Sequence, residues 1–143
     1  MIAAQNGPGF PAVPDGLRLG AVVPAAGLSS RMGRLKPALP LGTATVLECA
    51  VACLREAGAA EVVVVTGREA DTVGALARRA GARPVHNPRY AEGMFGSMTT
   101  GMAALGPEVD AFFVLPADTP LVRPATCRAV AGALAASGAD WAV

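Results

Sequence analysis

The most constraining feature of the sequence is the segment 61–66, in which four consecutive valines follow one another without a polar residue. A strand with one face in water alternates apolar and polar residues, because successive side chains point to opposite faces. The unbroken run therefore predicts a strand buried on both faces, which is typical of a parallel sheet covered by helices. Residues 19–23 are similarly apolar, so we expect a first buried strand there.

Helical and extended patterns alternate along the rest of the chain. Thr45 and Glu48 form a T-x-x-E capping box, which predicts the start of a helix that ends at Gly58. Two prolines in 37–42 argue against a helix and favour extended chain. Further helices are expected over 69–80, from Ser97 to about Leu105 and from Pro124 to about Ser137, and further strands over 83–86, over 110–115 (buried) and from Asp140 onward.

This alternation predicts an α/β fold, with a doubly wound, mostly parallel sheet and helices on both faces, of the Rossmann-like type. We expect one domain over residues 19–143, preceded by a flexible leader over residues 1–18. Ligands of such sheets bind beyond the carboxyl ends of the strands. The residues that follow each strand are therefore the first candidates for a functional site.

Composition excludes several classes of protein. A formal net charge of +1 without basic runs argues against a nucleic-acid surface, and residues 1–18 match neither a secretory signal nor a membrane span. The three cysteines cannot all pair and form no C-x-x-C motif, so we expect neither a disulfide framework nor a zinc site. Cys49 and Cys53 are expected to be small buried hydrophobes. We expect a cytoplasmic protein.

The segment 24–36 has the composition of a polyphosphate-binding loop. Gly27 and Gly33 expose backbone N–H groups, Ser29 and Ser30 add hydroxyls, and three cations lie at positions 31, 34 and 36. The Walker pattern fails because Arg34 follows the second glycine, and the G-x-G-x-x-G pattern fails at its later glycines. The residues indicate a nucleotide bound in some other way.

Asp118 directly follows the expected strand 110–115 and stands between two prolines. A carboxylate fixed at such a position can bind Mg²⁺, which favours one or two carboxylates together with phosphate oxygens and water. The same residue can instead cap the turn that follows the strand. The segment 87–98 is a long loop with two glycines, which can either bind a ligand or serve as a flexible connection in which Ser97 only caps a helix.

Three of these segments together resemble the MobA-like nucleotidyltransferases. The first carries Ala25-Ala26-Gly27, Arg31-Met32-Gly33 and Lys36; the second is Asp118-Thr119-Pro120, which matches an Asp-x-Pro element; the third, 87–97, resembles the N-P-x-x-x-x-G-x-x-x-S segment of the molybdenum-cofactor cytidylyltransferase branch. Pro24 departs from the family, which usually has leucine before A-A-G. The resemblance covers residues 19–143 and implies a domain truncated at its C-terminus, without the part that binds the acceptor.

The resemblance implies a site residue by residue. Arg31, Lys36 and Asp118 would be catalytic, and Asp118 would also hold the metal. The nucleotide would contact Ala25, Ala26, Gly27, Ser29, Ser30, Arg31, Gly33, Lys36, Thr66, Asn87, Glu92, Gly93 and Ser97. For Thr66 a simple turn role remains open, and for Glu92 a place in a flexible connection.

The activity implied is Mg²⁺-dependent transfer of NMP from CTP or GTP to a phosphate acceptor, with molybdopterin as the acceptor and a molybdoenzyme as a maturation partner. Two alternatives remain open at this point. One is transfer to a sugar phosphate or polyol phosphate. The other belongs to a different class and is a nucleotide-binding regulatory domain without turnover.

Overall fold

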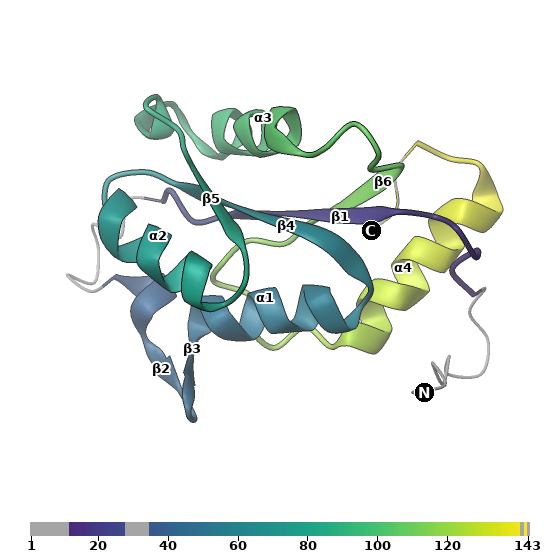
Figure 1. Cartoon of the computed structure of the whole chain (residues 1–143), viewed down its shortest axis with the longest axis horizontal. Helices are drawn as coiled ribbons and strands as arrows, with labels where there is room; N and C mark the ends of the chain where they lie inside the picture. The colour runs from purple at the N-terminus through teal and green to yellow at the C-terminus, as the bar shows by residue number, and fades with distance from the viewer. Residues whose placement is uncertain (1–11, 28–34, 141, 143) are drawn as a thin grey trace.

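The computed structural model of the protein describes residues 12–27, 35–140 and 142. A single main sheet crosses the molecule, with α3 on one face and α1, α2 and α4 on the other (Figure 1). In chain order the elements, with η for 3-10 helices, are β1 Leu19–Pro24, η1 Lys36–Ala38, β2 Pro40–Leu41, β3 Ala44–Thr45, α1 Val46–Glu56, β4 Ala59–Thr66, α2 Ala70–Arg79, β5 Arg83–His86, η2 Tyr90–Glu92, α3 Met94–Ala104, β6 Ala111–Val114 and α4 Pro124–Ser137.

The main sheet has four strands in the order β5-β4-β1-β6, and every pairing in it is parallel. β1 lies in the middle, with Val22 opposite Val63 of β4 and Val114 of β6. The predicted α/β fold with a parallel sheet and helices on both faces is therefore confirmed. All four strands end at the same edge of the sheet, which places their following loops together.

Burial on both faces explains the missing polar alternation. Val62 and Val64 pack into the core beneath α1 and α2, whereas Val63 and Val65 pack against Val22 and the end of α3 on the opposite face. Each of these four valines is at most 1% exposed. Full burial of a valine side chain contributes about 1.5 to 3 kcal/mol relative to an exposed one. The apolar run of β4 therefore contributes to the cores on both faces of the sheet.

The predicted capping box at the start of α1 is present. The Thr45 hydroxyl accepts a hydrogen bond from the Glu48 N–H, and the Glu48 carboxylate accepts one from the Thr45 N–H at 2.7 Å. The same carboxylate accepts a hydrogen bond from the guanidinium of Arg79 in α2 at 2.8 Å. Glu48 therefore joins two helices on one face of the sheet.

Four expectations about local structure need correction. α3 begins at Met94, not Ser97, because Gly93 with φ 114° occupies the cap position and Ser97 lies within the helix. A short 3-10 helix, Lys36–Ala38, forms despite the two prolines, because Pro37 lies in its first turn, where no N–H is needed from it. β6 is only partly buried, with Phe112 38% exposed, because no described strand pairs with its outer edge. No strand forms at Asp140 or Ala142, while Trp141 and Val143 lie outside the described residues.

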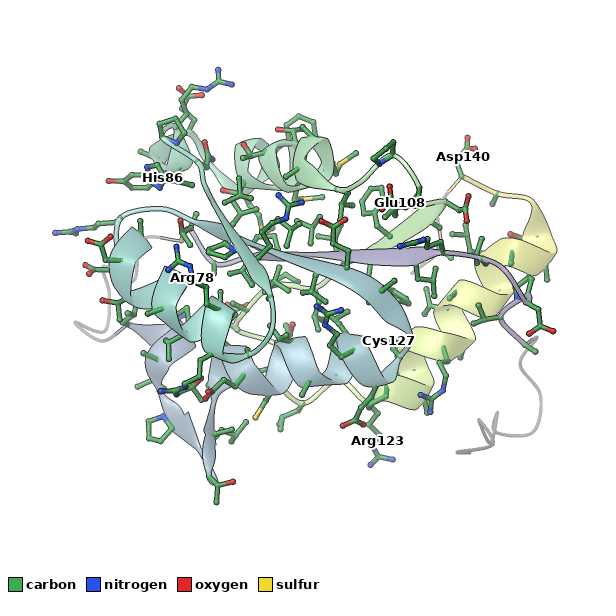
Figure 2. All side chains as sticks on the ribbon, in the orientation of Figure 1. Arg78, His86, Glu108, Arg123, Cys127 and Asp140 are labelled. Carbon is green, nitrogen blue, oxygen red and sulfur yellow. The ribbon has the colours of Figure 1, made fainter. Side chains whose placement is uncertain are left out.

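The three cysteines are free thiols. Cys53 and Cys127 are buried with their sulfurs 4.0 Å apart, and Cys49 is half-buried. Figure 2 labels Cys127 on α4, the helix that packs beside α1. Among the described residues, no helix has the length and apolar character needed to cross a membrane.

The packing of α3 on the sheet depends on Gly101. A methyl group there would overlap Val22 and come within 2.9 Å of Val65. Gly101→Ala should therefore destabilise the protein by about 1 to 3 kcal/mol through overpacking. Gly74→Ala in α2 is the matched control, because its methyl group would meet no described atom closer than 3.6 Å and should stabilise by about 0.5 to 1 kcal/mol. Urea unfolding measures both, and equal effects would contradict the packing argument.

Glu48 gives the stability a defined pH dependence. Hydrogen bonds from Arg79 and Thr45 lower the pKa of its carboxyl group from 4.5 to about 2. Because the folded pKa is the lower one, the carboxylate stabilises the fold above pH 4.5, and this contribution is lost as the pH falls toward 2. Glu48→Gln should lower the free energy of unfolding at pH 7 and flatten its decline in that range. Urea unfolding at a series of pH values measures the effect, with Glu108→Gln, an exposed pair partner of Arg18, as the control.

Candidate functional site

A cavity of about 360 Å³ opens at the carboxyl edge of the sheet. Its walls come from the end of β1, from η1, from the segment that contains η2 and the start of α3, and from the loop after β6. This volume lies within the range of sites that bind small molecules and cofactors. The position agrees with the general rule for ligands of parallel sheets.

Backbone hydrogen bonds continue the ladder past the ends of the strands. The Ala25 N–H donates to Val65 O at 2.9 Å, and the Ala117 N–H donates to Pro24 O at 3.1 Å. The residues after β1 and those after β6 are thereby held side by side. Pro24 is tolerated in this central strand because it is the last residue, and its carbonyl still accepts from the neighbouring chain.

The loop after β6 presents Asp118 to the cavity. The Thr119 hydroxyl and N–H both donate to Pro116 O, at 2.7 and 3.1 Å, so Thr119 closes this turn. Within the described part of the chain, the Asp118 carboxylate accepts no hydrogen bond and forms no ion pair. The side chain is therefore available to a ligand, and the turn has its closing bonds from another residue.

Lys36 lies at the start of η1, on the side of the cavity nearer α1 and α2. It is the only lysine in the sequence, and its side chain is exposed. A lysine ammonium is a compact, mobile point charge suited to phosphate oxygens. Together Lys36 and Asp118 give this side of the cavity one cation and one anion.

The opposite side of the cavity carries no charged residue among those described. It is built from Tyr90, Ala91, Gly93, Met94 and Ser97, which belong to η2 and the first turn of α3. α3 covers the other face of the sheet from α1 (Figure 1). The residues that line the cavity therefore run from a charged side to a neutral one. A ligand with a charged end and an uncharged end would fit this arrangement.

Seven of the predicted site residues line the cavity: Ala25, Ala26, Gly27, Lys36, Gly93, Ser97 and Asp118. Thr66 and Asn87 are not among the lining residues and are buried beneath the wall, at 2% exposure each. Glu92 is exposed and does not line the cavity either. The predictions for Ser29, Ser30, Arg31 and Gly33 lie outside the described residues.

Several lining residues were not predicted as site residues: Pro24, Pro37, Tyr90, Ala91, Met94, Pro116 and Ala117. All of them are within three residues of a predicted one in the chain. Extending each motif by a few residues would have found them, because a ligand that contacts a loop also contacts its neighbours. Tyr90 alone carries a distinct signal, as the single tyrosine of the chain.

Buried polar contacts hold the neutral wall. The Asn87 amide NH₂ donates to the Ser97 hydroxyl oxygen at 3.2 Å, and the Arg89 N–H donates to the amide oxygen of Asn87 at 3.0 Å. The Asn87 N–H itself donates to Thr66 O at 2.9 Å. The rings of His86 and Tyr90 lie 6.5 Å apart, and Figure 2 labels His86 at the end of β5. The loop is thereby tied to β4 and to α3.

Residues 21–143 match the profile of the MobA-like NTP transferase domain. This match covers most of the chain, including every described residue that lines the cavity. The chain belongs to the MobA-like NTP transferase family. The family resemblance predicted from the motifs is thus confirmed.

Two curated proteins illustrate the relationship. The bifunctional protein GlmU of Geobacter metallireducens is 33% identical over 129 residues, which are 87% of this chain and 27% of that protein. The molybdenum cofactor cytidylyltransferase of Escherichia coli is 31% identical over 88 residues, which are 61% of this chain and 45% of that protein. The matched part of the MobA-like chain spans less than half the length of each curated relative.

Solved structures agree with this assignment. A nucleotidyl transferase from Methanothermobacter thermautotroptrophicus superimposes with a TM-score of 0.74 at 34% identity, covering 81% of this chain and 57% of that one. A Mycobacterium tuberculosis protein crystallised in complex with manganese gives a TM-score of 0.63 at 25% identity, with coverages of 85% and 59%. The MobA-like domain therefore shares its fold with nucleotidyltransferases.

Gly67 permits the close approach of the two walls. A methyl group at this residue would lie 2.7 Å from Ala26 O and 2.8 Å from Tyr90 Cβ, and neither atom can rotate away. Gly67→Ala should displace η2 from the end of β1, lower the stability by about 1 to 3 kcal/mol and weaken nucleotide binding. Thermal unfolding and nucleotide titration measure the two effects.

The matched control is Gly96→Ala in α3, where the added methyl group would lie 3.7 Å from the nearest described atom, Asn87 Nδ2. This variant should melt at or above the wild-type temperature, since alanine favours the helix. If the Gly67→Ala protein is as stable as this control, the residues around Gly67 can move apart without loss of stability, which would contradict the packing argument.

Proposed function

We propose that the protein is a magnesium-dependent nucleotidyltransferase, which transfers NMP from CTP or GTP to a phosphorylated acceptor and releases pyrophosphate. The observation that carries the proposal is that Gly27, Lys36 and Asp118, from three separate segments, line one cavity in a chain of this family. The charged side of that cavity suits a triphosphate, and the neutral side suits a base.

The reaction forms one bond and breaks one. An oxygen of the acceptor phosphate attacks the α-phosphorus of the NTP, and the bond from that phosphorus to the bridging oxygen of the β-phosphate breaks. The electron pair leaves with pyrophosphate. No protein nucleophile is needed, so the residues act by position and charge.

In this proposal Lys36 neutralises negative charge that develops on the α-phosphate. Its exposed ammonium group on the charged side can follow the phosphate during transfer. Gly27 offers its backbone N–H to the phosphates, and the described atoms leave open space where a Cβ would stand. Arg31, Ser29, Ser30 and Gly33 remain proposed triphosphate contacts.

Asp118 fits a magnesium site. Mg²⁺ is bound in phosphate sites through one or two carboxylates, with phosphate oxygens and water as the other ligands. The Asp118 carboxylate faces the cavity and accepts no bond from the described residues, which leaves its oxygens for a cation. A bound ion would supply positive charge to the triphosphate. A solved relative was crystallised in complex with manganese, which supports a divalent ion in the proposed reaction.

The proposed acceptor and nucleotide are based on the names of the relatives. The E. coli relative is a molybdenum cofactor cytidylyltransferase, which supports CTP and a molybdopterin acceptor. A molybdoenzyme would then be the downstream partner. The choice between CTP and GTP would reside in the segment 87–97, in which Met94 lines the cavity and Glu92 does not, because phosphate contacts do not distinguish bases.

Pyrophosphate release with molybdopterin, a sugar phosphate and a polyol phosphate as acceptors tests the reaction. Release with one of them alone identifies the acceptor, and NTP binding without any release would indicate a regulatory domain instead.

Lys36→Ala and Asp118→Asn should each reduce turnover about 100-fold or more, the scale of one preorganised electrostatic contact. Calorimetric NTP titration should also show that Asp118→Asn removes the enhancement by Mg²⁺.

Asp71→Asn is the matched control, since Asp71 is an exposed carboxylate on α2 that does not line the cavity. It should keep both turnover and the effect of Mg²⁺. An Asp118→Asn protein that retains the full effect of Mg²⁺ would remove Asp118 from the metal site and overturn this mechanism.

A further inference from the structure

Two buried polar residues, Asn87 and Ser97, share a hydrogen bond at the neutral wall of the cavity. In the described part of the chain only three polar residues are classed as buried, Thr66, Asn87 and Ser97, and all three lie at or beneath the neutral wall of the cavity. Ser97 is 3% exposed and lines the cavity, whereas Asn87 lies behind it.

The direction of the bond follows from the Arg89 backbone. The Arg89 N–H can only donate, so the atom of the Asn87 amide that it contacts at 3.0 Å is the oxygen. The other end of the amide, 3.2 Å from Ser97 Oγ, is therefore the NH₂ group, which can only donate. Ser97 thus accepts from Asn87, and its own proton remains unused by this bond.

The Ser97 proton has no acceptor among the described residues. Thr99 and Thr100, on the same helix, donate back to carbonyl oxygens of the preceding turn at 2.8 to 3.2 Å, but Ser97 forms no such bond. A buried hydroxyl proton without an acceptor is unfavourable, because the hydrogen bond it would make to water is not replaced. A ligand in the cavity that brings an acceptor atom would remove this cost.

We infer that Asn87 is a positioning residue that commits the Ser97 hydroxyl to donate into the cavity, where it binds an acceptor atom of the nucleobase. This inference rests on the proposed function, because it assigns the base to the neutral wall and the phosphates to the side of Lys36 and Asp118. Asn87 acts through Ser97 and does not itself touch the nucleotide. The base must then present a ring nitrogen or carbonyl oxygen, not an amino group, to this wall.

Asn87→Asp tests the direction of the bond. Aspartate has nearly the same shape and can still accept from the Arg89 N–H, but its carboxylate cannot donate to Ser97. The Ser97 hydroxyl would turn to donate to the carboxylate, and the base would lose its donor. We expect the affinity for NTP to fall about 10-fold or more, the equivalent of one buried hydrogen-bond donor.

Magnesium tripolyphosphate serves as a ligand without a base. The measured quantity is the ratio of its dissociation constant to that of the NTP, obtained by calorimetry for the wild type and the variant. Asn87→Asp should lower this ratio, because the added charge repels both ligands while only the NTP loses the bond to Ser97. An unchanged ratio would overturn the inference, whether both affinities fall together or neither falls.

Ser97 variants complete the test. Ser97→Ala should lower the same ratio, and adding Asn87→Asp to it should lower the ratio no further, since the two residues act through one hydroxyl. Ser97→Thr keeps the hydroxyl and should restore the wild-type ratio. Additive losses in the double variant would overturn the inference. A wild type that binds neither NTP nor tripolyphosphate would instead refute the proposed function itself.

Discussion

Strand β1 has no side that faces water, and the rest of the structure depends on that burial. Its residues pair with β4 on one edge and β6 on the other, while alternate side chains enter the cores beneath α1 and beneath α3. Both layers of helices are therefore held through one central strand. α3 can approach the sheet closely at Gly101 only because glycine has no side chain that would overlap Val22 below it.

The site follows from the way this strand ends. Hydrogen bonds from Ala25 to Val65 and from Ala117 to Pro24 extend the ladder just far enough to bring three loops to one edge. Charge lies on the side of η1 and the loop after β6, and uncharged groups lie on the side of η2 and α3. A nucleotide has the same polarity, with a charged triphosphate and an uncharged base. The end of the sheet thus places charged and uncharged groups on opposite sides of one cavity.

Much of the fold could be predicted because its signals are local. The capping box at Thr45, the valine run of β4 and the proline at the start of α4 each act within a few residues, and the structure has each where it was expected. The predicted start of α3 at Ser97 was wrong, because Gly93, with its positive φ, takes the cap position. The burial of β6 was overestimated because an edge position is a property of the sheet and not of the strand's own residues.

The sequence by itself determined the fold class, the family and the motifs that carry Gly27, Lys36 and Asp118, because periodicity and short motifs are properties of neighbouring residues. Only the tertiary structure decided which residues meet. It placed Asn87 behind the wall and Ser97 within it, and it left Glu92 outside the cavity. The direction of the bond between Asn87 and Ser97 likewise depends on a third group, the Arg89 N–H. These contacts and burials depend on how distant parts of the chain pack together, so local sequence patterns do not predict them.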